Sequence, residues 1–290
     1  MTHLCFVAGS PISHSRSPMI HGFWMAERGL DARYERIETT PDQLAGLLAR
    51  VRTGELRGGN LTVPLKEAVI PHLDELTPDA AAMGAVNTVW MKDGRLMGAN
   101  TDVDGFFEHL GQELPGWSCA GRDVLVLGAG GAARAIVHGL MRRGAAAVTI
   151  ANRSAARAEA LVSSLADSRP GASTRLRLAS WPVGADQIAA HAMVVNTTSL
   201  GMKGQPPLPI DWPARVDGQV FYDIVYAPLV TPFLAEARAR GGLTVDGLGM
   251  LLHQAALAFG HWFGTVPRVG RELRALVEAD LVAPAQAGRP

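Results

Sequence analysis

Residues 124–134 constrain the fold of this chain more than any other stretch. They read as a short apolar strand, a turn rich in glycine and the start of a helix that we expect to run to about Arg143. Gly128, Gly130 and Ala133 have the G-x-G-x-x-G/A spacing of a dinucleotide-binding turn, with the helix N-terminus free to bind phosphate. The first glycine permits the sharp bend, the second lets the backbone approach a pyrophosphate, and the small third residue lets the helix pack closely. A plain strand–turn–helix corner is the alternative, but a second predicted strand follows the helix and favours a nucleotide site.

The residues after that second strand decide between NAD and NADP. An NAD enzyme usually places Asp or Glu there to hold the ribose hydroxyls. This chain has Asn152-Arg153-Ser154, with Arg157 one helical turn later. An acid would repel a 2′-phosphate, whereas arginine can pair with it through two hydrogen bonds, so the sequence favours NADP. Ser154 is also suited to cap the next helix, and two surface arginines beside a capped helix are the alternative interpretation.

The composition indicates a globular protein without a polyanionic partner. Its 290 residues correspond to about two domains. A content of 48% apolar and 19% charged residues suits a sizeable core. The formal net charge of zero argues against nucleic acid or an anionic membrane as a partner. The expected partner is a small-molecule substrate, and the expected state of the chain is a monomer or a homodimer.

The cysteines and the first residues of the chain favour a cytoplasmic location. Cys5 and Cys119 sit in unrelated contexts without CxxC spacing, as expected in a reducing compartment. The N-terminal residues lack a basic leader and read as a strand, and no stretch is long and apolar enough to span a bilayer. The nine histidines show no metal-ligand spacing, and we expect no metal.

Strands alternate with helices along the chain, which predicts an α/β protein with a parallel, doubly wound sheet. Asp93-Gly94 predicts a hairpin turn, and residues 111–122 read as a hinge before the nucleotide-binding unit. The loop 196–209 follows a strand end, where doubly wound sheets bind ligands. We expect the tail 286–290 to be disordered.

Two further stretches carry residues that suit a ligand but also have ordinary structural interpretations. Ser15 and Ser17 follow the first strand and are suited to donate hydrogen bonds to a small anion. Ser17 precedes a proline, so taken alone it reads better as a helix N-cap. Gly247, Met250 and Gln254 share one face of a predicted helix, which either borders a ligand or packs in the core.

Lys66, Asp102 and Asn87 are candidates for chemistry at the substrate. Lys66 lies in the first turn of a predicted helix, where the dipole disfavours a cation; it is either a solvated lysine or a proton-exchanging one. Asp102, at a strand-to-helix junction, is either a simple N-cap or the partner that orients the lysine amine. Asn87 is an amide in an otherwise apolar strand, so it needs a substrate hydroxyl or neighbouring backbone as its partner.

Eight segments together resemble the shikimate dehydrogenase family, over most of the chain from Gly9 to about Phe263. In combination these segments are highly specific. They are 11–18 (PISHSRSP), 60–67 (NLTVPLKE), 84–88 (GAVNT), 100–102 (NTD), 128–134 (GAGGAAR), 152–154 (NRS), 196–202 (NTTSLGM) and 246–250 (DGLGM).

The resemblance implies reversible NADPH-dependent reduction of 3-dehydroshikimate to shikimate, in the route to chorismate and the aromatic amino acids. The enzyme would be an oxidoreductase acting on a CH–OH group. The resemblance also implies an N-terminal α/β substrate domain at 1–104 and a Rossmann-type doubly wound NADP-binding domain at 105–246. C-terminal helices at 247–290 would return to the substrate domain.

The resemblance also assigns residues, with Lys66 and Asp102 as the catalytic pair. The implied substrate contacts are Ser15, Ser17 and Tyr226 at the carboxylate, and Thr62, Lys66, Asn87, Asp102 and Gln254 around the ring. The implied cofactor contacts are Gly128, Ala129, Gly130, Gly131, Ala132, Asn152, Arg153, Ser154, Arg157, Thr197, Ser199, Gly247 and Met250.

A few positions bear on the choice of substrate. Val103 stands where many members of the family have glycine, and Asp104 is an additional acid. Family members that also accept quinate, often with NAD, tend to carry threonine at the Ser17 position. They also tend to carry an acid directly after the second strand of the nucleotide-binding domain. This chain therefore favours shikimate and NADP. A quinate/shikimate or aminoshikimate dehydrogenase is the enzyme alternative, and a ligand sensor that kept the fold is the non-enzyme alternative.

Overall fold

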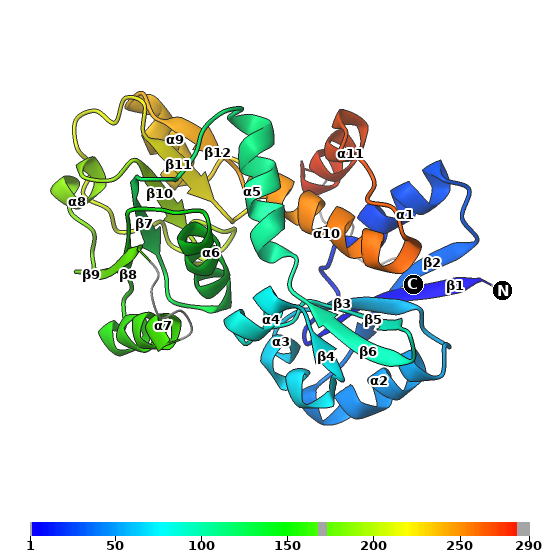
Figure 1. Cartoon of the computed structure of the whole chain (residues 1–290). Coiled ribbons are helices and arrows are strands. Elements are labelled where there is room, and N and C mark those ends of the chain that lie inside the picture. The colour runs from blue at the N-terminus through cyan, green and yellow to red at the C-terminus, as the bar shows by residue number, and fades with distance from the viewer. Residues whose placement is uncertain (1, 168–172, 283–290) are drawn as a thin grey trace. The chain divides into compact units, whose positions relative to one another are not determined.

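The computed structural model describes residues 2–167 and 173–282, which fall into two compact units (Figure 1). Unit 1 spans Met1–Thr101 and Leu252–Pro290, and unit 2 spans Asp102–Leu251. The tail 286–290, predicted to be disordered, lies outside the described residues.

The sheet of unit 2 is a parallel sheet with the order β12-β11-β10-β7-β8-β9. The winding direction reverses between the neighbouring strands β7 and β10, which is the switch point of a Rossmann-type fold. The strands are β7 (Asp123–Leu127), β8 (Ala147–Ala151), β9 (Arg175–Ala179), β10 (Met193–Asn196), β11 (Val220–Asp223) and β12 (Leu243–Val245).

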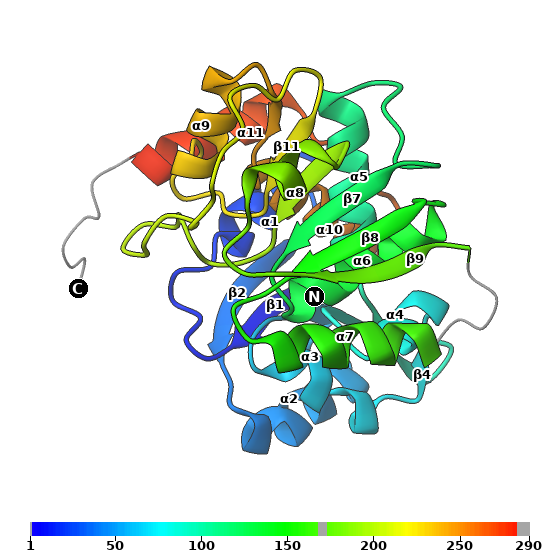
Figure 2. The same ribbon diagram turned by 90° about the vertical axis from the view of Figure 1, so that its left-hand side faces the viewer.

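Helices cover both faces of this sheet (Figure 2). Alternate residues of β7 point to opposite faces: Val124 and Val126 pack with α5, α6 and α7, whereas Leu125 and Leu127 pack with α8 and α9. The predicted doubly wound α/β fold is therefore confirmed. The helices are α5 (Asp102–Glu113), α6 (Gly131–Arg142), α7 (Ala155–Asp167), α8 (Ala185–Ala189) and α9 (Pro232–Ala239).

The sheet of unit 1 is mixed, with the order β2-β1-β3-β5-β6-β4. β1 pairs in parallel with β2 and β3, whereas β5 pairs antiparallel with β3 and β6. The β5–β6 hairpin turns through Asp93 (φ 50°) and Gly94 (φ 76°), which confirms the predicted Asp-Gly turn. The strands are β1 (His3–Gly9), β2 (Ala32–Glu38), β3 (Gly58–Leu61), β4 (Glu75–Leu76), β5 (Thr88–Lys92) and β6 (Arg95–Ala99).

The C-terminal helices pack on this N-terminal sheet, as predicted. Trp262 donates its indole N–H to the Val89 carbonyl at 3.2 Å, and Phe259 stacks on His21 within a buried aromatic cluster. Burial lowers the pKa of His21 to about 3, so its ring is neutral in this cluster. The helices are α1 (Ser17–Glu27), η1 (Pro41–Gln43), α2 (Leu44–Arg52), α3 (Leu65–Ala68), η2 (Ile70–His72), α4 (Pro78–Met83), α10 (Leu248–Phe263) and α11 (Arg271–Val282).

The structure corrects the predicted start of α1. The helix begins at Ser17 with Arg16 as its N-cap, and no side chain caps it. Because the backbone of Arg16 is already helical (φ −93°, ψ −1°), Ser17 is the first helical residue and its hydroxyl has no capping role. Helices α4 and α9 were not predicted, although Thr77 and Thr231 cap them and a proline follows each cap.

Helix α10 allows a packing prediction. A Cβ at Gly249 would overlap the His109 ring of α5, whereas a Cβ at Gly46 in α2 meets no described atom within 4 Å. Alanine in an open helical position is favoured over glycine by about 0.5–1 kcal/mol. We therefore expect Gly46→Ala to raise, and Gly249→Ala to lower, the free energy of unfolding measured with urea. Similar effects of the two substitutions would contradict the close packing of Gly249 on His109.

Candidate active site

One edge of the unit 1 sheet collects most of the predicted substrate residues. β1 and β3 are parallel, and β6 runs in the same direction as β3 because both pair antiparallel with β5. The segments that follow β1, β3 and β6, and the segment that precedes β5, therefore meet at one edge. The residues on these segments are Ser15, Ser17, Thr62, Lys66, Asn87 and Thr101.

A chain of buried hydrogen bonds begins at β2 and crosses β3. Tyr34 donates its hydroxyl to Asn60 Oδ1 at 2.7 Å. Asn60 Nδ2 in turn donates to Thr88 Oγ1 at 3.0 Å and to the Asn87 carbonyl at 3.1 Å. The amide of Asn60 is thereby satisfied inside the sheet, and it fixes the segment that carries Asn87.

The same chain continues from Asn87 to α10. Asn87 Oδ1 accepts the backbone N–H of Thr101 at 2.9 Å, and Asn87 Nδ2 donates to Thr101 Oγ1 at 3.0 Å. Thr101 Oγ1 lies 3.5 Å from Gln254 Oε1, which brings Gln254 to this edge. Of the two partners expected for the Asn87 amide, the structure supplies neighbouring backbone. A contact between Asn87 and the substrate stays a prediction.

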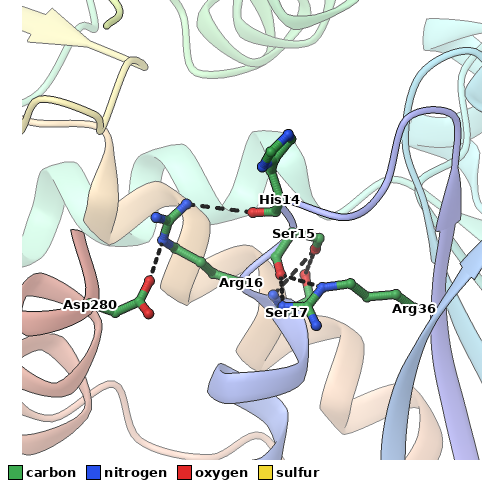
Figure 3. A network of polar contacts seen from close by, with 6 residues as sticks. All are labelled: His14, Ser15, Arg16, Ser17, Arg36 and Asp280. Atoms are coloured by element: carbon green, nitrogen blue, oxygen red, sulfur yellow. Dashed lines mark hydrogen bonds and ion pairs between the residues drawn. The ribbon is translucent and has the colours of Figure 1, made fainter. Parts of the chain in front are cut away.

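Ser15 and Ser17 form a hydroxyl pair at the N-terminus of α1 (Figure 3). Ser15 Oγ donates to Ser17 Oγ at 3.2 Å, and the Ser17 backbone N–H donates to Ser15 Oγ at 3.3 Å. Ser17 is buried and Ser15 is half-buried. Two hydroxyls at the positive end of an α-helix favour a small anion such as a carboxylate.

Backbone hydrogen bonds hold Thr62 and Lys66 at the same edge of the sheet. The N–H of Thr62 donates to the Ala8 carbonyl at 2.9 Å, and the Lys66 carbonyl accepts the Val86 N–H at 2.8 Å. A Cβ at Gly9 would overlap the Thr62 methyl group, so the glycine lets the two loops approach closely. Lys66 is half-buried.

The other two predicted substrate residues belong to unit 2. Asp102 is the first residue of α5, and Tyr226 follows β11 and is half-buried. The predicted pair of Lys66 and Asp102 is thus divided between the units and stays a prediction.

The dinucleotide-binding turn has the geometry that its sequence predicts. Gly128 has φ 114°, and a Cβ there would lie 2.5 Å from Thr197 Oγ1. Gly130 is the N-cap of α6, and added Cβ atoms at Gly130 and Gly131 meet no described atom within 4 Å. Ala133 is fully buried against the sheet. The N-terminus of α6 is therefore open to a pyrophosphate.

The segment after β8 is an exposed, positively charged turn. Arg153, Ser154 and Arg157 are exposed at the start of α7, and Asn152 Nδ2 donates to the Ser154 carbonyl at 2.8 Å. Within the described residues, neither arginine forms an ion pair with a carboxylate. Because the positive end of a helix disfavours cations, two uncompensated arginines there suit a bound anion. This arrangement fits the 2′-phosphate of NADP.

Asp223 is a buried carboxylate at the carboxyl end of β11 in unit 2, and it was not among the predicted site residues. It accepts hydrogen bonds from Asn196 Nδ2 at 2.9 Å, the Val225 N–H at 2.9 Å and Thr231 Oγ1 at 2.7 Å. Burial raises the pKa of Asp223 to about 6, although these three hydrogen bonds oppose the rise. The sequence does contain a signal for Asp223, because an acidic residue at the end of an apolar strand is unusual enough to suggest a buried carboxylate.

The same edge holds the remaining predicted cofactor residues. Thr197 Oγ1 donates to the Leu127 carbonyl at 2.7 Å, and Ser199 is exposed in the loop that follows. A Cβ at Gly247 would overlap the backbone of Ile224, so the start of α10 lies directly against the end of β11. Met250 packs in the hydrophobic cluster of unit 2, and its contact with a nicotinamide stays a prediction.

The part of the chain that the structure describes contains neither a cluster of metal ligands nor a membrane-spanning helix. No group of three or more His, Cys, Asp or Glu side chains there is arranged to hold a metal ion. None of the described helices is both long and apolar enough to cross a membrane. Cys5 and Cys119 are buried and free.

A Rossmann-type unit with a glycine-rich turn and a second α/β unit with a polar sheet edge define a two-domain, dinucleotide-dependent oxidoreductase. Three family models match this chain. They are the shikimate dehydrogenase substrate binding domain at 7–89, shikimate / quinate 5-dehydrogenase at 110–180 and the shikimate 5′-dehydrogenase C-terminal domain at 247–271.

Individual proteins agree with these models. The shikimate dehydrogenase (NADP(+)) of Methylobacterium radiotolerans is 51% identical over 284 residues, which cover 97% of this chain and 98% of that protein. The ligand-free 5-ketofructose reductase of Gluconobacter sp. strain CHM43 superposes with a TM-score of 0.87 at 31% identity, covering 97% of this chain and 99% of that one. The shikimate 5-dehydrogenase of Thermus thermophilus, in complex with NADP(H) and shikimate, gives a TM-score of 0.80 at 36% identity, covering 97% of this chain and 100% of that one. The chain belongs to the shikimate dehydrogenase family, and the resemblance found in its sequence is confirmed.

Asp223 makes the stability of the protein depend on pH. Its folded-state pKa of about 6 exceeds the ordinary value of 3.8, so the folded protein binds this proton more tightly than the unfolded chain does. The resulting stabilisation is complete below about pH 4 and is lost as the pH rises through about 6. Relative to Asp223→Asn, we expect the free energy of unfolding to fall by roughly 1–3 kcal/mol over this window. Urea denaturation of both proteins from pH 4 to 7 measures it, and a difference that does not vary with pH would contradict the assignment.

Proposed function

We propose that this chain is an NADP-linked shikimate dehydrogenase, which catalyses the reversible reduction of 3-dehydroshikimate to shikimate in aromatic amino acid biosynthesis. The observation that carries the proposal is the polar edge of unit 1. There a serine pair, a half-buried lysine and a buried amide lie on segments that meet at the ends of neighbouring strands. Relatives named for this activity, with NADP(+) as cofactor, cover 97% of the chain and support it.

The substrate is a hydroxylated ring with one carboxylate. The hydroxyl pair of Ser15 and Ser17, together with Tyr226, binds the carboxylate. Thr62, Asn87, Asp102 and Gln254 bind the ring hydroxyls. A site of this kind discriminates strongly, because a substrate lacking a hydroxyl leaves buried polar groups without a partner.

Lys66 moves the proton of the reaction. In the direction of reduction, negative charge develops on the ring oxygen, and the Lys66 ammonium donates a proton to that oxygen. Asp102 keeps the amine aligned and shares its proton. In the direction of oxidation, the neutral amine of Lys66 accepts the proton of the ring hydroxyl. NADPH, when bound, supplies the hydride.

The chain's own groups hold the cofactor at two places. The N-terminus of α6, reached through Gly128, Gly130 and Gly131, binds the pyrophosphate. The exposed arginines Arg153 and Arg157 bind the 2′-phosphate. Gly247 lies against the end of β11 and borders the nicotinamide.

Other oxidoreductase activities are the main alternatives. The 5-ketofructose reductase with a TM-score of 0.87 shows that this fold also serves an uncharged ketone substrate. A quinate/shikimate or aminoshikimate dehydrogenase would use the same serine pair as the proposed enzyme. A sensor that kept the fold would bind shikimate and NADPH without turnover.

Initial rates of nicotinamide reduction by the purified protein test the proposal. The assay pairs shikimate or quinate with NADP⁺ or NAD⁺, and a fifth reaction follows the oxidation of NADPH in the presence of 5-ketofructose. Strong activity only with shikimate and NADP⁺ is the expected result. Comparable activity with quinate or NAD⁺ would refute the assigned specificity. Activity confined to 5-ketofructose would refute the substrate, and binding without turnover would favour the sensor.

The proposed role of Lys66 predicts a loss of turnover. Removing a positioned proton donor typically costs about 10²–10⁴ in rate. We expect Lys66→Ala to lower kcat for shikimate by a factor in this range, while shikimate still binds in calorimetric titration. Lys92 lies on the same unit at the exposed end of β5, so Lys92→Ala is the matched control and should leave kcat unchanged. Turnover near that of the unaltered protein in Lys66→Ala would rule out the catalytic role.

The proposed 2′-phosphate site predicts a cofactor-selective defect. Arg153→Ala removes a donor that only NADP engages, so we expect KM for NADP⁺ to rise about tenfold or more. The weaker activity with NAD⁺ should change little. Steady-state kinetics with both cofactors measure the effect, and equal losses for NADP⁺ and NAD⁺ would contradict the assignment.

A further inference from the structure

Side chains of strand β2 hold the loop between β1 and α1, which carries the serine pair, through hydrogen bonds to its backbone. Arg36 and Glu38 lie two residues apart on this strand, so their side chains leave the same face. Glu38 Oε2 accepts the backbone N–H of Ile12 at 3.1 Å. Arg36 donates from both Nε and Nη2 to the carbonyl oxygen of Ser15, at 2.9 and 2.5 Å (Figure 3). Neighbouring side chains of one strand therefore fix the loop at two points.

The contact of Arg36 acts on the peptide of Ser15 itself. A guanidinium that donates two hydrogen bonds to one carbonyl restrains the orientation of that peptide plane. The hydroxyl of the same residue is bonded to Ser17 Oγ at 3.2 Å. Holding the Ser15 carbonyl thus also sets the direction of the hydroxyl pair.

Arg36 on β2 also differs in charge balance from Arg16, which lies in the loop itself. Arg16 forms an ion pair with Asp280 of α11, with Nε and Oδ2 2.9 Å apart (Figure 3). Arg36 is exposed and, within residues 2–167 and 173–282, bonds a neutral carbonyl and forms no ion pair. Its positive charge is therefore available beside the two serine hydroxyls, where the positive end of α1 already favours an anion.

We propose that Arg36 is the positioning residue that makes the serine pair specific for a carboxylate. It aligns the two hydroxyls through the Ser15 peptide, and it supplies the charge that distinguishes an ionised acid from an uncharged group. This inference rests on the proposed function, which places the substrate carboxylate at Ser15 and Ser17.

A comparison of shikimate with its methyl ester tests the inference, because the ester keeps the ring and loses the charge. Arg36→Gln removes the charge and the paired hydrogen bonds. Arg36→Lys keeps the charge but loses the paired hydrogen bonds to the Ser15 carbonyl. Arg33 is exposed on the same strand and points to the opposite face, so Arg33→Gln is the control for net charge. The readouts are kcat and KM for each substrate with NADP⁺.

We expect Arg36→Gln to raise KM for shikimate about 10- to 100-fold, with little change in kcat or in KM for NADP⁺. The kcat/KM for the ester should fall much less than that for shikimate, because the ester needs the aligned hydroxyls but not the charge. The kcat/KM of Arg36→Lys for shikimate should be intermediate, and Arg33→Gln should resemble the unaltered protein. Equal losses of kcat/KM with shikimate and with the ester would show that Arg36 only holds the loop in place, and would overturn the inference. An unchanged KM in Arg36→Gln, or an equal effect of Arg33→Gln, would overturn it too. If the unaltered protein fails to oxidise shikimate, the proposed function itself falls, and this outcome is seen before any variant is compared.

Discussion

The need of buried amides for hydrogen-bond partners organises unit 1. Asn60 and Asn87 lie in the sheet interior, where an amide without a partner would cost roughly 1–3 kcal/mol. Their bonds reach Tyr34 on β2, Thr88 on β5 and Thr101 after β6, so one polar chain joins most of the sheet. The segments at the sheet edge are consequently fixed by interior contacts, and so are the proposed substrate residues that they carry.

A corresponding interaction organises the cofactor edge of unit 2. The Asp223 carboxylate receives hydrogen bonds from the end of β10, from the backbone after β11 and from the cap of α9. Thr197, one residue past Asn196, then closes against Gly128 and bonds the Leu127 carbonyl. The glycine-rich turn is thus supported by its neighbouring strand as well as by its own backbone conformation. The burial that raises the pKa of Asp223 is a consequence of placing this support inside the protein.

Local sequence patterns predicted the parts of the protein whose geometry is local. The turn at 128–133 and the hairpin at Asp93-Gly94 depend on a few consecutive residues, and both formed as expected. The roles of Arg36 and Asp223 depend on which strands become neighbours, which no short pattern encodes. β2 has to lie beside β1 before Arg36 can reach the Ser15 carbonyl. The serine pair is local, because Ser15 and Ser17 are two residues apart, and the structure shows their hydroxyls bonded to each other. The interpretation of Ser17 as a helix cap was wrong, because Arg16 already has a helical backbone conformation.

The exposure of residues 153–157, where we propose the 2′-phosphate site, has a consequence for how this protein can be altered. Arg153, Ser154 and Arg157 lie on the surface, outside the hydrophobic cluster of unit 2, and exposed positions of this kind tolerate replacement with little loss of stability. The polar edge of unit 1, by contrast, shares its hydrogen bonds with the sheet interior. With the 2′-phosphate bound at these exposed residues, as we propose, cofactor preference is a separable property that single substitutions can redirect. A change of substrate requires coordinated replacement of residues that also hold the fold together.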